Sequence, residues 1–247
     1  MQKLQKAIKL INSSQHITVF TGAGISVESG IPPFRGENGL WEKYDPYFLH
    51  INYFMKNPKK SWELNKELFY NMLTDCEPNK AHQVVAELEK DGYVHAVITQ
   101  NIDNLHQKAG SENVYKFHGT YKNLVCIECG KKYEFEEDYL KDLPPHCNNC
   151  SGILKPDYIF FGEGIPQSAY QASIKESEEA DLFIVIGTTG QVTPASLIPE
   201  MAARNGSYII EVNTKKSSYT DSITDVFLKG KATEVMEKLY KLLKDKI

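Results

Sequence analysis

The sequence predicts an α/β protein built on an open, doubly wound parallel sheet, with a smaller second lobe. Two observations predict the sheet. Short apolar runs rich in branched residues recur along the chain, and amphipathic segments with helical spacing separate them, a pattern typical of buried parallel strands covered by helices. A third observation predicts the second lobe, because four clustered cysteines lie in a region without this alternation. A chain of 247 residues is long enough for one large and one small domain.

The elements of the predicted sheet follow one another from the first residues onward. Apolar residues at helical spacing from Leu4 to Ile11, with lysines between them, predict an amphipathic surface helix. This segment lacks the unbroken apolar core of a secretion signal. The apolar runs predict four strands, and the amphipathic pattern predicts two further helices. The strands are expected at 17–20, 96–98, 182–186 and 208–212, and the helices at 81–88 and 235–243.

Two segments interrupt this order, and we expect them to be insertions that together form the small lobe. Residues 43–80 have a helical and aromatic pattern, whereas residues 121–157 hold the cysteine pairs and short predicted strands. The remainder of the chain, 1–42, 81–120 and 158–247, is assigned to the large domain. In a doubly wound sheet, ligands bind beyond the carboxyl ends of the strands.

The composition is that of an ordinary globular protein, with 41% hydrophobic and 24% charged residues. A formal net charge of -4 argues against general electrostatic binding to nucleic acid or to an anionic membrane. Of 28 basic residues only Arg35 and Arg204 are arginines. Any bidentate contact of a side chain with phosphate must therefore come from one of these two. No stretch approaches the roughly 20 apolar residues that span a bilayer. We therefore expect a cytoplasmic protein.

Four of the five cysteines form two pairs, each with two residues between its members. Cys126 and Cys129 form the first pair, Cys147 and Cys150 the second, and 17 residues separate the pairs. This spacing predicts one tetrahedral Zn²⁺ site. Four thiolates leave no open coordination position, so the zinc would stabilise the fold and would not activate water. A nucleic-acid-binding zinc ribbon is disfavoured, because the region has more acidic than basic residues.

A glycine-rich turn directly follows the first predicted strand. Gly22 and Gly24 permit a tight turn and a close approach of the backbone to a phosphate. Backbone amides at the start of the next helix are expected to face that anion. The third glycine of the dehydrogenase fingerprint would fall at position 27, which is Val27. The loop therefore predicts phosphate binding and disfavours a plain dehydrogenase.

Six motifs in order along the chain resemble those of the sirtuin family. They lie at 22–35 (GAGIS, SGIP and FR), 99–106 (TQNIDNLH), 117–119 (FHG), 161–163 (FGE), 187–189 (GTT) and 212–213 (VN). The resemblance extends from about residue 17 to residue 232 and is of the prokaryotic type. It implies a Rossmann-like NAD-binding domain with a zinc-ribbon and helical insertion lobe. It also implies a deacetylase or deacylase that uses NAD as co-substrate and converts acyl-lysine to free lysine, nicotinamide and O-acyl-ADP-ribose.

The resemblance also implies roles for individual residues. His118 is expected to be the catalytic base, and an imidazole accepts protons near neutral pH. Asn101 is expected to place a water, Asp103 to hold the nicotinamide carboxamide, and Arg35 to neutralise pyrophosphate or steady the ribose. The full set of expected NAD contacts is Gly22, Ala23, Gly24, Ser26, Val27, Phe34, Arg35, Gln100, Asn101, Ile102, Asp103, His118, Gly187, Thr188, Thr189, Asn213, Thr214, Lys231 and Ala232.

An acylated-lysine peptide is expected to bind as an added strand, as the resemblance implies. Two departures from the usual family pattern are Pro33 in the first motif and Gly190 near the peptide cleft, where a more usual residue would supply apolar contact. Peptide preference is the property that Gly190 is expected to change. The expected peptide contacts are Phe160, Phe161, Gly162, Glu163, Gln191 and Val192.

The acyl group is expected to be neutral. Residues 34–41 resemble the branch of the family that includes desuccinylating members, which use a Tyr-x-x-Arg pair to bind an acyl carboxylate. In this chain the corresponding positions are Asn65 and Leu68, so no cation is left to match an acidic acyl group. We therefore expect a preference for acetyl or longer neutral chains.

Two other functions are compatible with the same motifs. A protein mono-ADP-ribosyltransferase would use the same pocket and transfer the ribose to a protein side chain. A non-catalytic NAD sensor is disfavoured by His118, Asn101 and Asp103. Neither nucleic acid nor membrane is expected as a direct partner.

Overall fold

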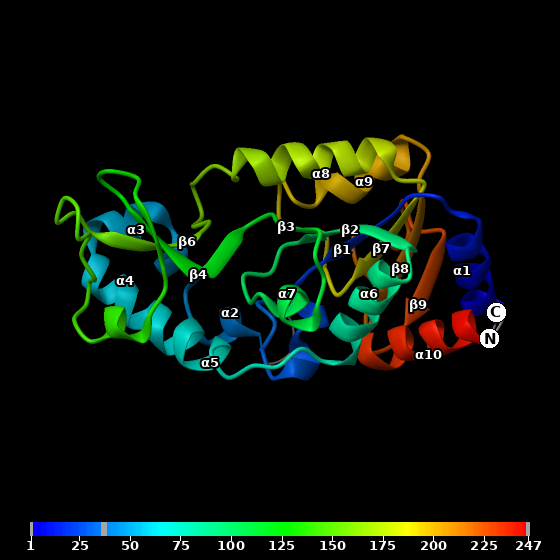
Figure 1. The fold of residues 1–247 in the computed structure, drawn as a ribbon, viewed down its shortest axis with the longest axis horizontal. Helices are drawn as coiled ribbons and strands as arrows, with labels where there is room; N and C mark the ends of the chain where they lie inside the picture. Colours follow the sequence, from blue (N-terminus) through cyan, green and yellow to red (C-terminus); the bar gives the residue numbers. More distant parts are fainter. Residues whose placement is uncertain (1, 36–38, 246–247) are drawn as a thin grey trace.

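Six parallel strands form the central sheet in the computed structural model, which describes residues 2–35 and 39–245 (Figure 1). Their order is β3-β2-β1-β7-β8-β9, so the chain winds outward from β1 in one direction and from β7 in the other. This order makes the boundary between β1 and β7 a topological switch point. The doubly wound parallel sheet is confirmed. The strands are β1 (Ile17–Thr21), β2 (Val94–Thr99), β3 (Val114–Lys116), β7 (Leu182–Ile186), β8 (Tyr208–Asn213) and β9 (Val226–Lys229).

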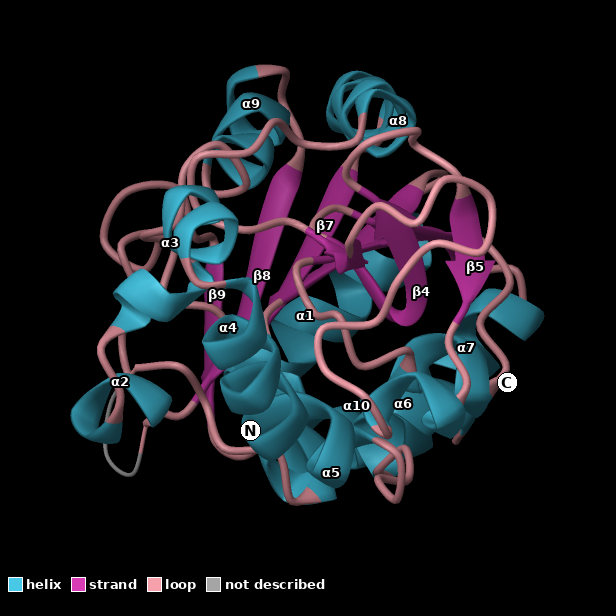
Figure 2. Ribbon diagram, turned by 90° about the vertical axis from the view of Figure 1, so that its left-hand side faces the viewer, coloured by secondary structure: helices cyan, strands magenta, loops and turns pink. Residues whose placement is uncertain are grey.

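Helices cover both faces of this sheet (Figure 2). On one face α1 (Gln2–Ser13), α6 (Lys80–Lys90) and α10 (Ala232–Lys244) share a buried apolar cluster with β1, β2, β7 and β8. On the other face lie α8 (Gln167–Glu179) and α9 (Leu197–Arg204). Because both faces are covered, every residue of β1 and β7 is buried. Within the described part of the chain, no helix combines the length and apolar character needed to cross a membrane.

The predicted elements of the sheet are confirmed. The runs at 17–20, 96–98, 182–186 and 208–212 lie in β1, β2, β7 and β8. The expected helices at 81–88 and 235–243 lie in α6 and α10, and the amphipathic opening segment is α1.

The start of α6 is tied to the loop that follows β1. Asn79 caps the helix by accepting a hydrogen bond from Ala81 N at 2.9 Å, and its own amide donates to Ile25 O at 2.7 Å. His82 completes a capping box, because its Nδ1 accepts from Asn79 N. The cap therefore stabilises the helix and fixes the loop at the same time.

The helical and cysteine-rich segments lie together at the other end of the molecule (Figure 1). A three-stranded antiparallel sheet in the order β5-β4-β6 packs there against helices. The two segments share one buried cluster that includes Phe54, Trp62, Tyr70, Leu124 and Leu154. The assignment of 43–80 and 121–157 to one lobe stays a prediction, which this shared core supports. The elements are α2 (Leu40–Lys43), α3 (Ile51–Lys56), α4 (Pro58–Asn65), a π-helical turn (Lys66–Tyr70), α5 (Asn71–Leu73), β4 (Gly119–Cys126), β5 (Lys132–Glu134) and β6 (Leu154–Tyr158).

Candidate active site

A cavity of about 950 Å³ lies at the carboxyl ends of the parallel strands. Opposite the sheet it is lined by residues of the helical and cysteine-rich end, among them Leu49, Phe69 and Tyr158. The cavity is thus where a doubly wound sheet binds its ligand. On the side of the sheet it is lined by residues that end or follow successive strands, namely Gly22, Gln100, Gly187, Asn213 and Gly230.

The glycine loop packs directly on the backbone that follows β7. Gly24 N donates a hydrogen bond to Gly187 O at 2.8 Å, and a Cβ on Gly24 would lie only 2.6 Å from Gly187 Cα. Only glycine permits this approach.

The helix that follows the glycine loop is a short 3₁₀ helix and not an α-helix. Two 3₁₀ turns follow instead, at Ala23–Ile25 and Val27–Ser29. Gly30 then adopts a left-handed conformation with φ 91°, which ends the second turn. Pro32 and Pro33 follow, and proline interrupts an α-helix.

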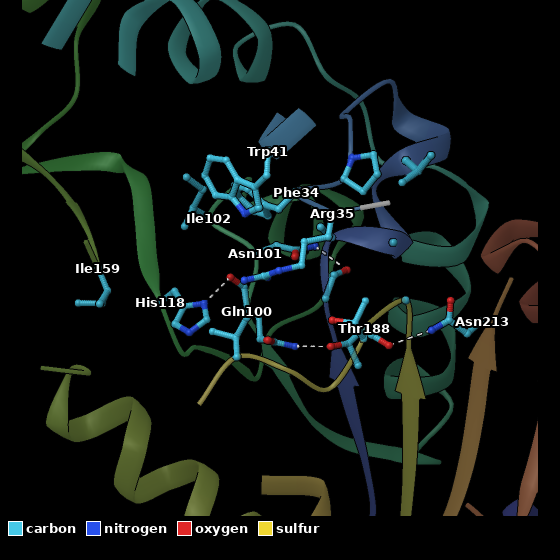
Figure 3. Close-up of a pocket in the computed structure, with 18 of the residues that line it drawn as sticks. Phe34, Arg35, Trp41, Gln100, Asn101, Ile102, His118, Ile159, Thr188 and Asn213 are labelled. Atoms are coloured by element: carbon cyan, nitrogen blue, oxygen red, sulfur yellow. Dashed lines mark hydrogen bonds between the residues drawn. The ribbon is translucent and has the colours of Figure 1, made fainter. Parts of the chain in front are cut away.

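One chain of hydrogen bonds joins four strand ends at the rim of the cavity (Figure 3). Gln100 N donates to Thr21 O at 2.9 Å, and the Gln100 side chain donates to Thr188 Oγ1 at 3.1 Å. Asn213 Nδ2 donates to Thr188 O at 2.8 Å. The ends of β1, β2, β7 and β8 are therefore held in register where polar groups face the cavity.

His118 lines the cavity, and its ring has one hydrogen-bond partner among the described residues (Figure 3). Its Nδ1 lies 3.0 Å from the carbonyl oxygen of Gln100. A carbonyl only accepts hydrogen bonds, so Nδ1 bears the proton and Nε2 of the neutral ring is left as an acceptor. Burial lowers the pKa of His118 below its usual value, and the bond to Gln100 opposes that effect. The imidazole is therefore neutral at pH 7 and can act as a base.

Ser26 and Asp103 form a buried polar group behind the cavity wall. Ser26 Oγ donates to Asp103 Oδ2 at 2.7 Å, and Leu105 N donates to Oδ1 at 3.0 Å. Asn101, which does line the cavity, donates from Nδ2 to Ser26 Oγ at 3.1 Å and to Gly22 O at 3.2 Å. Burial raises the pKa of Asp103, and its hydrogen bonds lower it. This group holds Asn101 and the glycine loop together, while direct contact of Asp103 with NAD stays a prediction.

Most of the predicted site residues come together at the cavity. Every predicted NAD or peptide contact lines it except Ser26, Asp103 and Gln191. Arg35 is exposed and its side chain extends into the cavity (Figure 3). The further lining residues were not predicted as contacts from the sequence, and they are Glu28, Pro33, Trp41, Leu49, Phe69, Tyr158, Ile159, Ile165, Thr193, Pro194, Val212, Lys215, Lys216 and Gly230. Lys215 and Lys216 directly follow the predicted Thr214 and could have been found from that position.

The part of the cavity opposite the sheet is apolar. Phe34 packs against Trp41 and Phe69, with ring centroids 5.2 and 6.4 Å apart. Asn65 and Leu68 are buried and do not line the cavity. Asn65 donates to Ser61 O at 2.7 Å and accepts a hydrogen bond from the Tyr158 hydroxyl. Of the segment 34–41, residues 36–38 lie outside the described residues.

Gly190 does not leave a gap beside the cavity. It has a left-handed backbone with φ 68°, and a Cβ there would lie 2.8 Å from Tyr219 Cζ. The Tyr219 ring and the Ser218 hydroxyl thus occupy the space that a side chain at position 190 would need. Neither Gly190 nor Tyr219 is among the residues that line the cavity.

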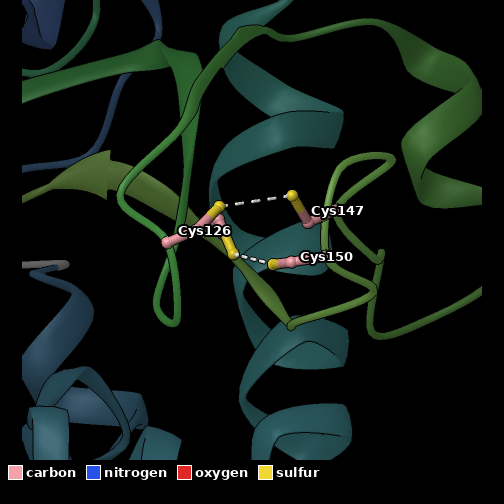
Figure 4. Close-up of side chains that lie close together, drawn as sticks. Cys126, Cys147 and Cys150 are labelled. Atoms are coloured by element: carbon pink, nitrogen blue, oxygen red, sulfur yellow. Dashed lines mark hydrogen bonds between the residues drawn. The ribbon is translucent and has the colours of Figure 1, made fainter.

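The four paired cysteines converge on one point (Figure 4). All four Sγ atoms lie within 4.8 Å of one another, with Cys126 and Cys150 3.5 Å apart and Cys129 and Cys147 3.7 Å apart. Four thiolates about 2.3 Å from a tetrahedral zinc would be about 3.8 Å apart. The donor set therefore fits Zn²⁺. None of the four lines the cavity, so the metal would act only as a structural cross-link.

Comparison with known proteins shows which family and which solved structures this chain resembles. The Sir2 family model matches residues 22–194. The chain is 44% identical to NAD-dependent protein deacylase 2 of Archaeoglobus fulgidus, covering 98% of this chain and 96% of that protein. It is 42% identical to NAD-dependent protein deacylase 2 of Pyrobaculum aerophilum, covering 96% and 95%. A solved structure of Sir2 with a p53 peptide and NAD⁺ is 35% identical with a TM-score of 0.90, covering 97% and 98%.

Proposed function

The chain belongs to the Sir2 family, and from that premise we propose that it is an NAD-dependent enzyme that removes neutral acyl groups from protein lysine side chains. The observation that carries the proposal is the position of His118. Its Nδ1 is committed to the Gln100 carbonyl, and the ring lines the same cavity as the glycine loop. A base is thereby available where the strand ends and the loop would hold NAD.

The proposed reaction uses acyl-lysine, NAD and water. The acyl oxygen of the modified lysine attacks the ribose carbon as nicotinamide leaves. His118 Nε2 then takes a proton from a ribose hydroxyl, whose oxygen attacks the carbon of the resulting imidate. Addition of water releases free lysine and O-acyl-ADP-ribose. Asn101, fixed by Ser26 and the Gly22 carbonyl, is proposed to orient water near the nicotinamide end.

The two sides of the cavity suit the two substrates. We assign the polar rim, with Gln100, Thr188 and Asn213, to NAD. The segment Phe160 to Glu163 and Val192 are assigned to the peptide, bound as an added strand. The apolar side with Leu49 and Phe69 is assigned to the acyl group. A bound zinc would supply only the cross-link that holds the strands of the small sheet.

The charges around the cavity support a neutral acyl group. The cations among the described lining residues are Arg35, Lys215, Lys216 and Lys231, and none of them belongs to the helical insertion. An acyl carboxylate on the apolar side would therefore be desolvated without a matching cation, which is unfavourable.

A product balance tests the proposal. The protein is incubated with an acetyl-lysine peptide, with and without NAD, and the products are identified by mass spectrometry. We expect one nicotinamide and one O-acetyl-ADP-ribose for each deacetylated peptide, and no reaction without NAD. ADP-ribose attached to protein without free O-acetyl-ADP-ribose would indicate a transferase. NAD binding without turnover of any acyl peptide would indicate a sensor.

Localisation in the cytoplasm stays a prediction.

A further inference from the structure

A buried lysine lies behind the segment that we assign to the peptide. The side chain of Lys155, on β6, is only 5% exposed. Its ammonium donates to Pro156 O at 2.7 Å and to Tyr158 O at 2.8 Å, and it pairs with Glu163 Oε2 at 3.0 Å. A lysine has three donors, so all of them are matched. The ammonium also lies 4.3 Å from the centroid of the Phe160 ring.

The same oxygen of Glu163 closes a tight turn. Glu163 Oε2 accepts from Phe160 N at 2.7 Å, and Glu163 N donates to Phe160 O at 3.0 Å. Gly162 in this turn has a left-handed backbone with φ 89°. The residues from Tyr158 to Glu163 all line the cavity, whereas Lys155 does not. Lys155 therefore contacts the cavity only through these residues.

The segment is fixed at two other points. Ile159 N donates to His118 O at 2.9 Å. Phe161 N donates to Leu49 O at 2.8 Å, and Ile51 N donates to Phe161 O at 3.0 Å. These bonds join the segment to the catalytic histidine on one side and to the helical insertion on the other. Within the turn from Phe160 to Glu163 they fix only Phe161, whereas Phe160 N and the Tyr158 carbonyl are held by Glu163 and Lys155.

A buried ion pair is weak evidence for stability, because apolar residues of the same shape often stabilise a protein as well or better. Burial lowers the pKa of Lys155, and the nearby Glu163 carboxylate opposes that effect. The ammonium charge is thus kept in a buried, unfavourable environment by three partners that all lie between Pro156 and Glu163. Such an arrangement is better explained by a requirement for one backbone geometry than by stability alone.

We propose that Lys155 is a positioning residue for the polypeptide substrate. Through Glu163 and the Tyr158 carbonyl it holds residues 158–163 in the form that receives the acyl-lysine peptide as an added strand. The inference rests on the proposed function, because it requires the peptide to pair with this segment.

Steady-state kinetics of Lys155→Met test the proposal. Methionine fills the space of the lysine stem and removes the charge. We expect the KM for an acetyl-lysine peptide to rise by about tenfold or more, with the KM for NAD and kcat at saturating peptide within about threefold of the wild type. The matched control is Lys132→Met, which removes a lysine of the same small sheet that is 65% exposed and lies 2.8 Å from Asp157. The control is expected to leave all three constants unchanged.

A second variant covers the case in which Lys155→Met does not fold. Glu163→Gln keeps an acceptor for Phe160 N and removes the negative charge, and we expect it also to raise the peptide KM selectively. In the double variant the two effects should be far from additive, because both residues act on one turn. An unchanged peptide KM in Glu163→Gln or Lys155→Met, or equal rises in the KM values for NAD and peptide, would overturn the proposal. Lack of turnover by the wild-type protein would instead count against the proposed function.

Discussion

The role of His118 depends on its bond to a backbone carbonyl 18 positions earlier in the chain. The motif around His118 suggested a base, but the sequence could not show which ring nitrogen is available. The structure supplies this information, because Gln100 O can only accept a hydrogen bond. A similar limit applies at Gly190, where the sequence indicated a missing side chain and the structure shows the Tyr219 ring in its place.

The lowered pKa of the single residue His118 gives a prediction for the pH dependence of kcat/KM. Burial lowers the pKa of His118, so the ring stays neutral and active as a base below the usual value of about 6.5. Activity is lost only when the pH falls through this lowered pKa. We therefore expect the acid limb of kcat/KM for the peptide to have its midpoint below about pH 6.5. A midpoint above pH 7, measured at saturating NAD, would contradict this assignment.

At the scale of elements, long buried strands could be predicted and short or polar elements could not. β3 and β9 have only three and four residues, too few for a pattern to appear. In α8 the buried residues are Ser173, Glu176 and Ser177, so the helix lacks an apolar stripe. Glu176 is buried because it accepts a hydrogen bond from Thr18 Oγ1 at 2.8 Å and pairs with His16. Only the folded chain reveals these partners.

The cysteine cluster gives a prediction for the small antiparallel sheet. Metal analysis should find one zinc per chain, and Cys126→Ser should release it and lower the free energy of unfolding by several kcal/mol, because β4 loses its cross-link to the turn at Cys147. Cys76→Ser is the matched control, since Cys76 is only partly buried and lies outside the cluster. It should retain zinc and stability. A fully stable, metal-free Cys126→Ser protein would contradict the structural role of the metal.

At the scale of the whole molecule, the cavity joins residues that are far apart in the sequence. Its polar side could be predicted, because the carboxyl ends of parallel strands meet at one edge of the sheet. Its apolar side could not be predicted, because Leu49 and Phe69 belong to the helical insertion. How that insertion packs against the sheet cannot be inferred from a local sequence pattern. The sequence did indicate that this insertion offers no cation at the positions of Asn65 and Leu68.

Acyl selectivity follows from this arrangement. We expect succinyl-lysine peptide to be turned over with a kcat/KM at least about tenfold lower than acetyl-lysine peptide, because its carboxylate would be buried without a partner. Butyryl-lysine peptide is the neutral control of similar length and should be turned over. Faster turnover of the succinyl peptide than of the acetyl peptide would contradict the assignment of the apolar side to the acyl group.

The central claim is that His118 acts as the base in an NAD-dependent deacylation. It is tested most directly by mass spectrometry of an acetyl-lysine peptide incubated with NAD and either the wild-type protein or His118→Ala. We predict deacetylation by the wild type together with O-acetyl-ADP-ribose, and a loss of rate of about 100-fold or more in a variant that still binds NAD and keeps its zinc. Full activity of His118→Ala, or no NAD-dependent deacetylation by the wild type, would contradict it.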